Sequence, residues 1–389
     1  MTPQGCTDSL FRGCHGGRVF LYSGLVSRPA SLQIRNCAFL DNRAGFGGGI
    51  WVDYAYGTGR IIITGCRFER NWSSDAGGGF YAIVGEYGKP YIRIDSCHFE
   101  NNTSWASGAF LLENYNKNID FVLSHSYFKN NRVTTIGGAG AIANYIVKAK
   151  DKVIIQECHF DSNQAYSRVY TTAGRGGALS TIGAIIRNCT FIKNKAVNGG
   201  AILVADSDVY NNIIAGNYAV ENGGAITGEY EVNLISNTII NNHAGKSGGM
   251  GDNFNKPRFK LINNIIWGNR AGESGDFFAN TVGLFLYLEH CVLDANDCES
   301  VESDLGHISN TLVCGLNLYF NLEPHFRDTA NGDYRLASCS PLLDLDDPTW
   351  VQQQGITTDF AGNPRILDDA PDIGAYEIKK EVPPPEITV

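Results

Sequence analysis

The sequence contains no run of 18 apolar residues, only 2 methionines and no excess of basic residues. Without an apolar run of that length, we expect no membrane-spanning helix. The net charge of −9 argues against nucleic acid or an anionic membrane surface as a partner. The first residues, MTPQGCTDSL, lack the basic and apolar regions of a signal peptide.

Glycine is abundant instead, with 45 residues among 389, and the sequence repeats itself. The clearest unit is 185–202, IIRNCTFIKNKAVNGGAI, in which a frame C-x-F-x-x-N precedes Gly-Gly-Ala-Ile. Successive frame asparagines are 23 to 32 residues apart, a period that indicates a stacked repeat architecture. They are Asn42, Asn71, Asn102, Asn131, Asn163, Asn194, Asn217, Asn242, Asn269 and Asn296.

Each unit predicts three short strands separated by corners. In one unit Ile92 and Ile94 alternate with polar residues, Cys97 and Phe99 follow a bend, and a glycine-rich strand follows Asn102 and a variable loop. Repetition of this pattern predicts an all-β fold, a single right-handed parallel β-helix of about ten to eleven coils with a C-terminal cap. We expect the longer loops at 53–60, 85–89, 114–118, 145–152 and 164–175, in the N-terminal half.

The frame residues have structural roles in this prediction. Phenylalanines two positions after the cysteine slot should stack in the core, and the frame asparagines should hydrogen-bond the coils above and below. Five of the 11 cysteines share the slot and should be buried thiols, with asparagines replacing them in later coils. Outside the repeat, Cys298 and Cys314 are the first candidates for a disulfide, and Cys6 and Cys14 are a second possibility.

The Phe-x-x-Asn and Gly-Gly-Ala-Ile halves of the frame resemble the repeat of the polymorphic outer-membrane proteins, a family of secreted β-helical adhesins. The match covers roughly residues 16–296, and Gly199–Ile202 is one of its cleanest parts. The resemblance implies adhesion and an extracellular or cell-surface location. Because such repeats are usually exported, we expect the chain to be a mature form or a piece of a longer protein.

A second series of motifs follows the repeat, and it resembles the C-terminal end of choice-of-anchor Q β-helix proteins, which are secreted bacterial surface proteins. The motifs lie at 323–328, 332–336, 340–344, 359–365 and 372–377. We therefore divide the chain into a β-helix at 1–297, final coils and a cap at 298–378, and a proline-rich linker at 379–389. The linker is expected to lead to further domains.

An enzymatic alternative requires two carboxylates close together, as in glycoside hydrolases, or acidic Ca²⁺ ligands near a basic residue, as in polysaccharide lyases. Asp53, Glu86 and Glu113 come from adjacent coils and are the candidate catalytic residues. Scattered solvated charges explain them equally well. No cofactor is required by the sequence, but Asp344, Asp346 and Asp347 could bind Ca²⁺, although aspartates in a turn more often cap the backbone.

Aromatic residues near the third predicted strand suggest a binding surface. Trp51, Tyr54, Tyr81 and Tyr115 are the candidate ligand-binding residues, because outward aromatic rings can stack on sugars or anchor a protein. Packing beneath their own loops is the competing explanation. The sequence thus favours a non-catalytic surface protein that binds a polysaccharide or a surface protein. A carbohydrate-active enzyme and a structural spacer are the alternatives.

Overall fold

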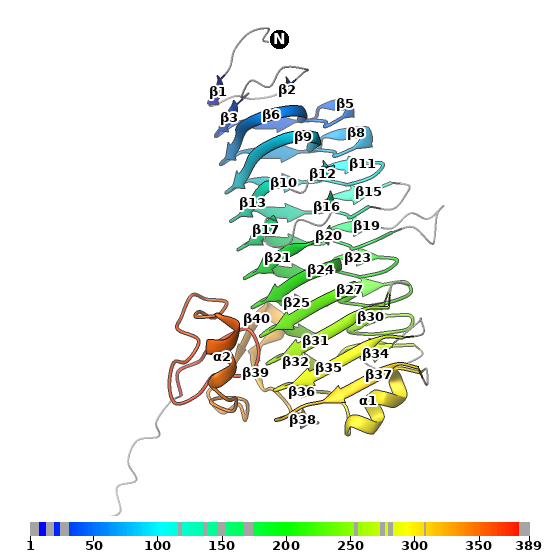
Figure 1. The fold of residues 1–389 in the computed structure, drawn as a ribbon, viewed down its shortest axis with the longest axis vertical. Coiled ribbons are helices and arrows are strands. Elements are labelled where there is room, and N and C mark those ends of the chain that lie inside the picture. The colour runs from blue at the N-terminus through cyan, green and yellow to red at the C-terminus, as the bar shows by residue number, and fades with distance from the viewer. Residues whose placement is uncertain are drawn as a thin grey trace, which may run out of the picture.

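A computed structural model describes residues 8–12, 19–23, 31–115, 119–134, 138–146, 153–165, 174–252, 256–272, 277–278, 283–306 and 309–380. The chain winds into a rod of parallel coils stacked from the N-terminal end downwards (Figure 1). About 9 turns of β-solenoid are present, close to the number expected. The predicted all-β parallel helix is therefore confirmed. No helix among the described residues is long and apolar enough to cross a membrane.

Sheet A is the widest wall of the rod. It has 18 strands within the described ranges. These are β1 (Asp8–Arg12), β2 (Val19–Ser23), β3 (Ser31–Arg35), β6 (Ile50–Thr64), β9 (Phe80–Asp95), β12 (Phe110–Asn114), β13 (Asp120–Ser124), β16 (Ile142–Ile146), β17 (Val153–Gln156), β20 (Leu179–Ile182), β21 (Ala184–Arg187), β24 (Ile202–Tyr210), β27 (Ile226–Ile235), β30 (Met250–Asp252), β31 (Arg258–Ile262), β34 (Phe277–Phe278), β35 (Phe285–Glu289) and β37 (Thr311–Cys314).

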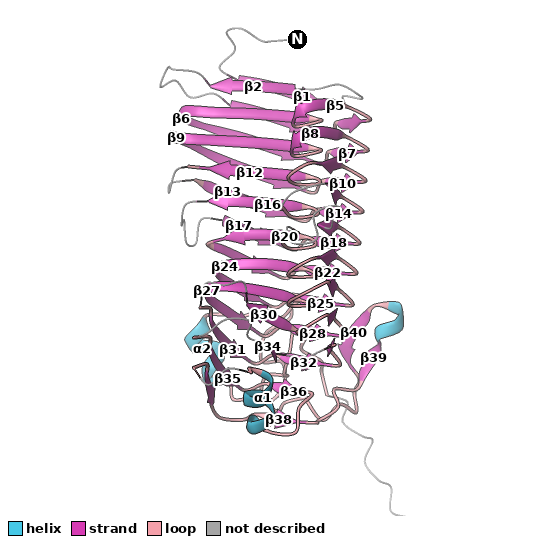
Figure 2. Ribbon diagram, turned by 90° about the vertical axis from the view of Figure 1, so that its right-hand side faces the viewer, coloured by secondary structure: helices cyan, strands magenta, loops and turns pink. Residues whose placement is uncertain are grey.

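Sheet B begins directly after the cysteine slot and carries the core phenylalanines. Its strands are β4 (Ala38–Leu40), β7 (Arg67–Glu69), β10 (His98–Glu100), β14 (Tyr127–Lys129), β18 (His159–Asp161), β22 (Thr190–Ile192), β25 (Ile213–Ala215), β28 (Thr238–Ile240), β32 (Ile265–Trp267), β36 (Val292–Leu293) and β38 (Tyr319–Phe320). All of these strands pair in parallel with the next coil (Figure 2).

Sheet C begins directly after the frame asparagines from Asn42 to Asn269. Its strands are β5 (Arg43–Phe46), β8 (Trp72–Ala76), β11 (Thr103–Ser104), β15 (Arg132–Val133), β19 (Gln164–Ala165), β23 (Lys195–Ala196), β26 (Tyr218–Ala219), β29 (His243–Ala244) and β33 (Arg270–Ala271). The sequence predicted a loop here. The third strand of each predicted unit and the first strand of the following unit both belong to sheet A. In β6, β9, β24 and β27 these two strands form one continuous strand.

The glycine-rich corner between sheets C and A needs residues without a side chain. A Cβ atom on Gly108 would lie 2.0 Å from the carbonyl oxygen of Gly140 in the next coil. A Cβ atom on Gly78 would likewise lie 2.2 Å from the carbonyl oxygen of Gly108. The close approach of backbones at this corner therefore explains the repeated glycines.

The predicted phenylalanine column fills the core. Ring centroids of successive members are 4.4 to 5.0 Å apart from Phe39 to Phe191, and each pair is nearly parallel. Ile214, Ile239, Ile266 and Leu293 continue the column and are fully buried. The frame phenylalanines and their aliphatic replacements therefore act as scaffold, as predicted.

The cysteine slot behaves as predicted. Six free cysteines in the described part of the chain are buried: Cys37, Cys66, Cys97, Cys158, Cys189 and Cys291. Asn212, Asn237 and Asn264 replace cysteine in the later coils and hydrogen-bond one another in sequence. The disulfide between Cys298 and Cys314 is present, whereas Cys6 and Cys14 lie outside the described residues.

The C-terminal region closes the rod in one part and packs beside it in another. Helix α1 (Cys298–Asp304) lies at the end opposite the N-terminus, and its Val301 joins the main core (Figure 1). Residues 321–380 instead lie beside the rod. Leu342 and Ile373 pack on Ile240 and Ile265 of sheet B, whereas Trp350 and Val351 pack on Ile235 and Ile262 at the ends of sheet A strands. This part includes the antiparallel pair β39 (Phe326–Asp328) and β40 (Asp333–Leu336), the short helix η1 (Thr329–Asn331) and α2 (Thr349–Gln354).

A buried polar network holds this lateral segment together. Arg365 is fully buried and its Nη1 lies 3.2 Å from Glu377 Oε1. Asp359 accepts a hydrogen bond from the Glu377 backbone N–H at 2.9 Å, and Asp372 accepts one from Ile378 N–H at 2.7 Å. The motifs at 359–365 and 372–377 therefore supply the polar interior of the segment. Beyond Lys380, the predicted linker lies outside the described residues.

Candidate functional site

The candidate residues of the N-terminal coils lie on sheet A, in strands longer than expected. The sequence predicted loops at 53–60 and 85–89, but both are continuous β-strand within β6 and β9. These strands pair in register from Tyr56 opposite Tyr87 to Arg60 opposite Tyr91. The prediction of loops here was wrong, because parallel pairing between the two excursions satisfies their backbone groups. The other predicted loops fall largely outside the described residues.

Tyr54 and Tyr81 are not available to a ligand. Tyr54 is fully buried in the main core, so its predicted place on the outer surface was wrong. Tyr81 points to the outer side but is only 5% exposed, and its hydroxyl donates to Glu113 Oε2 at 3.0 Å. Burial and the nearby Glu113 carboxylate raise the pKa of Tyr81. Both side chains are therefore structural.

Trp51 is half-buried in a small apolar cluster outside the main core. Its ring centroid lies 5.4 Å from that of Phe46 and 4.5 Å from that of Phe20. Phe46 belongs to β5, so part of Trp51 is covered by the chain that leads into the corner. The competing explanation expected cover by the residues' own loops. The structure instead covers much of Trp51 and Tyr81 with side chains of other segments, among them Phe46 and Leu111.

Tyr115 is exposed as predicted and belongs to a larger group of accessible tyrosines. Tyr22 and Tyr115 are each 58% exposed, and Tyr87 is 61% exposed. Tyr56 stacks on Tyr87 with ring centroids 5.4 Å apart. Tyr22, Tyr56, Tyr87 and Tyr115 lie in, or directly after, strands β2, β6, β9 and β12 of one sheet, and we call them the tyrosine face.

Two candidate carboxylates share one column beside the tyrosine face. Asp53 pairs with Ile83 in the next coil, and Ile83 pairs with Glu113 in the coil after that. Two strand spacings separate their Cα atoms by about 10 Å. Burial raises the pKa of Asp53, whereas Glu113 accepts hydrogen bonds from Tyr81 and Tyr115. Glu86 is exposed and lies outside this column.

The three aspartates considered for Ca²⁺ have partners within the protein. Asp346 is buried and contacts His290 Nδ1 and Trp350 Nε1. Asp347 accepts a hydrogen bond from the Thr349 backbone N–H, and Asp344 lies 3.4 Å from Lys380 Nζ. Among the described residues, no group of three acidic, histidine or cysteine side chains is arranged to hold a metal. These aspartates therefore stabilise the C-terminal segment.

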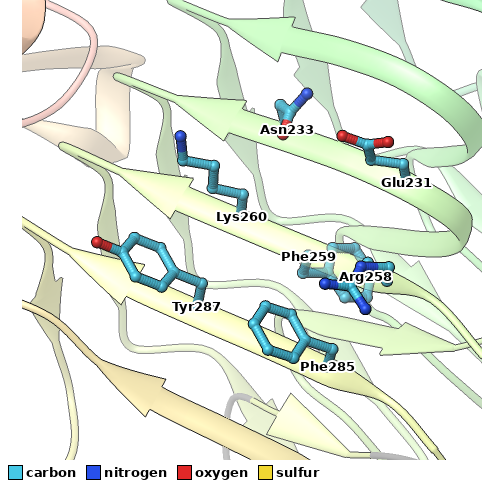
Figure 3. Close-up of a pocket in the computed structure, with 7 residues that line it drawn as sticks. All are labelled: Glu231, Asn233, Arg258, Phe259, Lys260, Phe285 and Tyr287. Carbon is cyan, nitrogen blue, oxygen red and sulfur yellow. The ribbon is translucent and has the colours of Figure 1, made fainter.

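A second candidate site is a groove of about 320 Å³ on sheet A in the last coils. Figure 3 shows the residues that line it. It is lined by Glu231, Asn233, Arg258, Phe259, Lys260, Phe285 and Tyr287. Strands β27, β31 and β35 supply these residues in register. Arg258 and Lys260 give the groove a basic character, whereas the protein as a whole has a net charge of −9.

Sequence reasoning missed this groove, although the sequence contains a signal for it. Glu231, Arg258 and Phe285 each stand six positions before the cysteine slot of their unit, and Asn233, Lys260 and Tyr287 stand four positions before it. Alignment of the units on the slot therefore predicts two neighbouring outward columns. In these three coils the two columns hold Glu231, Arg258 and Lys260 as charged residues and Phe285 and Tyr287 as aromatic rings.

Comparison with protein families supports the fold. A model described as "Right handed beta helix region" matches residues 5–217, which is more than half of the chain. Comparison with curated proteins and with solved structures gave no match. The family match includes the tyrosine face, and the groove of the last coils lies beyond it. The resemblances to adhesin repeats and to choice-of-anchor proteins stay predictions.

Proposed function

The chain belongs to the right-handed β-helix family, and we propose that it is a non-catalytic surface protein that binds glycan through its tyrosine face. The fold agrees with a surface or carbohydrate-related role in general. The choice of binding over catalysis rests on one observation, the exposure of three tyrosines on one wall of the rod.

Exposed tyrosines on a flat sheet are suited to sugar rings. A tyrosine offers an apolar ring face and a hydroxyl, and it loses little conformational entropy when it is held in place. Tyr87 is already stacked on Tyr56, so one face of the pair is fixed before a ligand arrives. Tyr115 is oriented by the contact of its hydroxyl with Glu113 Oε2 at 3.5 Å. The face is therefore partly preorganised for binding.

A surface location follows from the same proposal. A rod whose coils repeat along one axis presents the tyrosine face near its N-terminal end, while the C-terminal segment packs at the other end (Figure 1). That arrangement suits a protein displayed outward from a cell or secreted. A glycan or a glycosylated surface protein is the partner that this face would meet.

Hydrolysis is the second candidate function, and the column of Asp53, Ile83 and Glu113 favours it. The raised pKa of Asp53 suits a general acid, and Glu113 could act as a base. A separation of roughly 6.5–9.5 Å between carboxyl groups is typical of inverting glycosidases. The side chain of Ile83 stands between the two carboxylates, so a sugar would have to lie across it.

A glycan array followed by analysis of the bound polysaccharides separates these functions. Binding without release of reducing or unsaturated ends supports the proposal. Release of such ends that disappears in the Glu113→Gln variant would establish the enzymatic alternative instead. The absence of binding to any glycan would contradict the proposal and leave the role of a structural spacer.

A further inference from the structure

The groove of the last coils carries two cations without a carboxylate partner. Within the described residues, neither Arg258 nor Lys260 forms a salt bridge, and both are exposed. Several other exposed arginines do have partners on the protein. The pairs are Arg67–Glu69, Arg70–Asp41, Arg93–Asp95 and Arg335–Asp333. The groove thus holds two cations that form no salt bridge within the described residues, beside one carboxylate, Glu231.

Arg258 is held in a fixed orientation. Its guanidinium carbon lies 4.4 Å from the centroid of the Phe285 ring, which is a cation–π contact. A guanidinium held on a ring keeps its N–H edge free for a planar anion. Figure 3 shows Glu231, Arg258 and Phe285 on one side of the groove, and Asn233, Lys260 and Tyr287 on the other. An anion between the two columns would meet both cations.

The remaining polar groups suit hydroxyl groups better than a second charge. Asn233 donates from Nδ2 to Asp208 Oδ1 at 2.7 Å, which leaves its amide oxygen to accept from a ligand. Burial and a hydrogen bond to Glu289 raise the pKa of Tyr287, so this phenol stays neutral. Because Arg258 covers Phe285, Tyr287 is the ring against which a sugar would pack.

A peptide would gain little in this groove. Strands β27, β31, β35 and β37 pair with one another in sequence, so the sheet face offers no free backbone edge for strand addition. Recognition must come from side chains and ring faces. This requirement favours a saccharide over an acidic peptide.

We propose that the groove lined by Arg258, Lys260, Asn233 and Tyr287 binds a unit of a carboxylate-bearing saccharide. Arg258 and Lys260 bind the carboxylate, Asn233 accepts from a hydroxyl group and Tyr287 packs against the ring. Glu231 pairs in register with Arg258 and repels the ligand from that side, so the carboxylate lies toward Lys260. The site is separate from the tyrosine face and does not depend on the function proposed for it.

Isothermal titration calorimetry of the whole chain with an oligogalacturonate tests this site. We expect binding at low salt that weakens by roughly tenfold or more in the Arg258→Gln, Lys260→Gln double variant, since both charged hydrogen bonds to the carboxylate are lost. Glu231→Gln should tighten binding by roughly two- to fivefold, because it removes a like charge. Arg67→Gln is the matched control and should change nothing.

Three further measurements make the proposal falsifiable. The methyl ester of the same oligosaccharide should bind at least tenfold more weakly, and equal binding would overturn the role of the charge. Poly-glutamate should not compete, and equal competition would overturn the choice of a saccharide. No binding of the oligogalacturonate, or equal binding by the double variant with an unchanged circular dichroism spectrum, would overturn the site. A Tyr87→Ala, Tyr115→Ala variant should bind it normally, which separates this result from a failure of the tyrosine face.

Discussion

The side-chain amide of Asn194 donates from Nδ2 to Asn217 Oδ1 at 3.0 Å, and the Asn194 backbone N–H donates to the same oxygen at 2.9 Å. Asn194 Nδ2 also donates to the Phe160 carbonyl oxygen of the preceding coil. Equivalent contacts join frame asparagines from Asn42 to Asn269. The Asn194 side chain therefore satisfies two backbone groups of the preceding coil, the Phe160 carbonyl oxygen and the Asn163 N–H, at a corner that no sheet reaches.

Replacement of Asn194 by alanine should lower the free energy of unfolding by roughly 1–3 kcal/mol, because buried donors and acceptors lose their partners. Asn296→Ala is the matched control, since Asn296 occupies the same frame position but is exposed. Its effect should stay within about 0.5 kcal/mol. Denaturant titration measures both. Equal stability of Asn194→Ala and the parent would refute the structural role of the ladder.

The slot cysteines should react only after unfolding. Burial raises the pKa of Cys291 to about 12 and that of Cys97 well above its ordinary value, so neither forms a thiolate in the folded chain. After the thiols accessible in the folded state, including exposed Cys339, are blocked, six further cysteines should become reactive in denaturant. Mass spectrometry identifies them. Labelling of Cys97 or Cys158 in the folded chain would contradict their burial.

The stability of the C-terminal segment should fall as pH rises. Burial raises the pKa of Glu377 to about 9 although Arg365 lowers it, so folding favours the protonated form. A carboxyl group whose pKa is raised on folding contributes its full stability below its unfolded pKa of about 4.3. That contribution is lost as pH rises toward 9, at no more than about 1.4 kcal/mol per pH unit.

The Glu377→Gln variant tests this pH dependence, because glutamine keeps the shape of the side chain but does not titrate. Thermal unfolding between pH 5 and 9 should show a shallower loss of stability in this variant than in the parent. Glu86→Gln, at an exposed position, is the control and should keep the parental slope. An unchanged slope in Glu377→Gln would show that the Glu377 carboxyl titrates normally.

The scaffold could be predicted from the sequence because each structural role recurs at one place in the frame. The column from Phe39 to Phe191 and the asparagine ladder are both periodic, so ten imperfect copies reinforce one pattern. Sheet C was missed because a strand as short as Thr103–Ser104 has no hydrophobic alternation to reveal it.

The candidate site was less predictable because it depends on departures from the frame. Tyr54 was expected on the surface, but the side chains of β6 alternate from inward Val52 to outward Asp53 to inward Tyr54. The irregularity between Tyr54 and Tyr56 then returns the next tyrosine to the outside. Neither the bulge nor the pairing of the two long excursions follows from the repeat. The exposure of these tyrosines therefore could not be predicted from the sequence.

Affinity for a glycan identified on the array is the measurement that tests the proposed function most directly. Titration calorimetry should compare the parent with a Tyr87→Ala, Tyr115→Ala variant and with Trp72→Ala, which removes an exposed aromatic ring from sheet C. Stacking losses of about 0.5–1.5 kcal/mol for each ring predict a loss of roughly five- to 100-fold in the tyrosine variant and none in Trp72→Ala. Unchanged affinity of a folded tyrosine variant would contradict the tyrosine face as the binding surface.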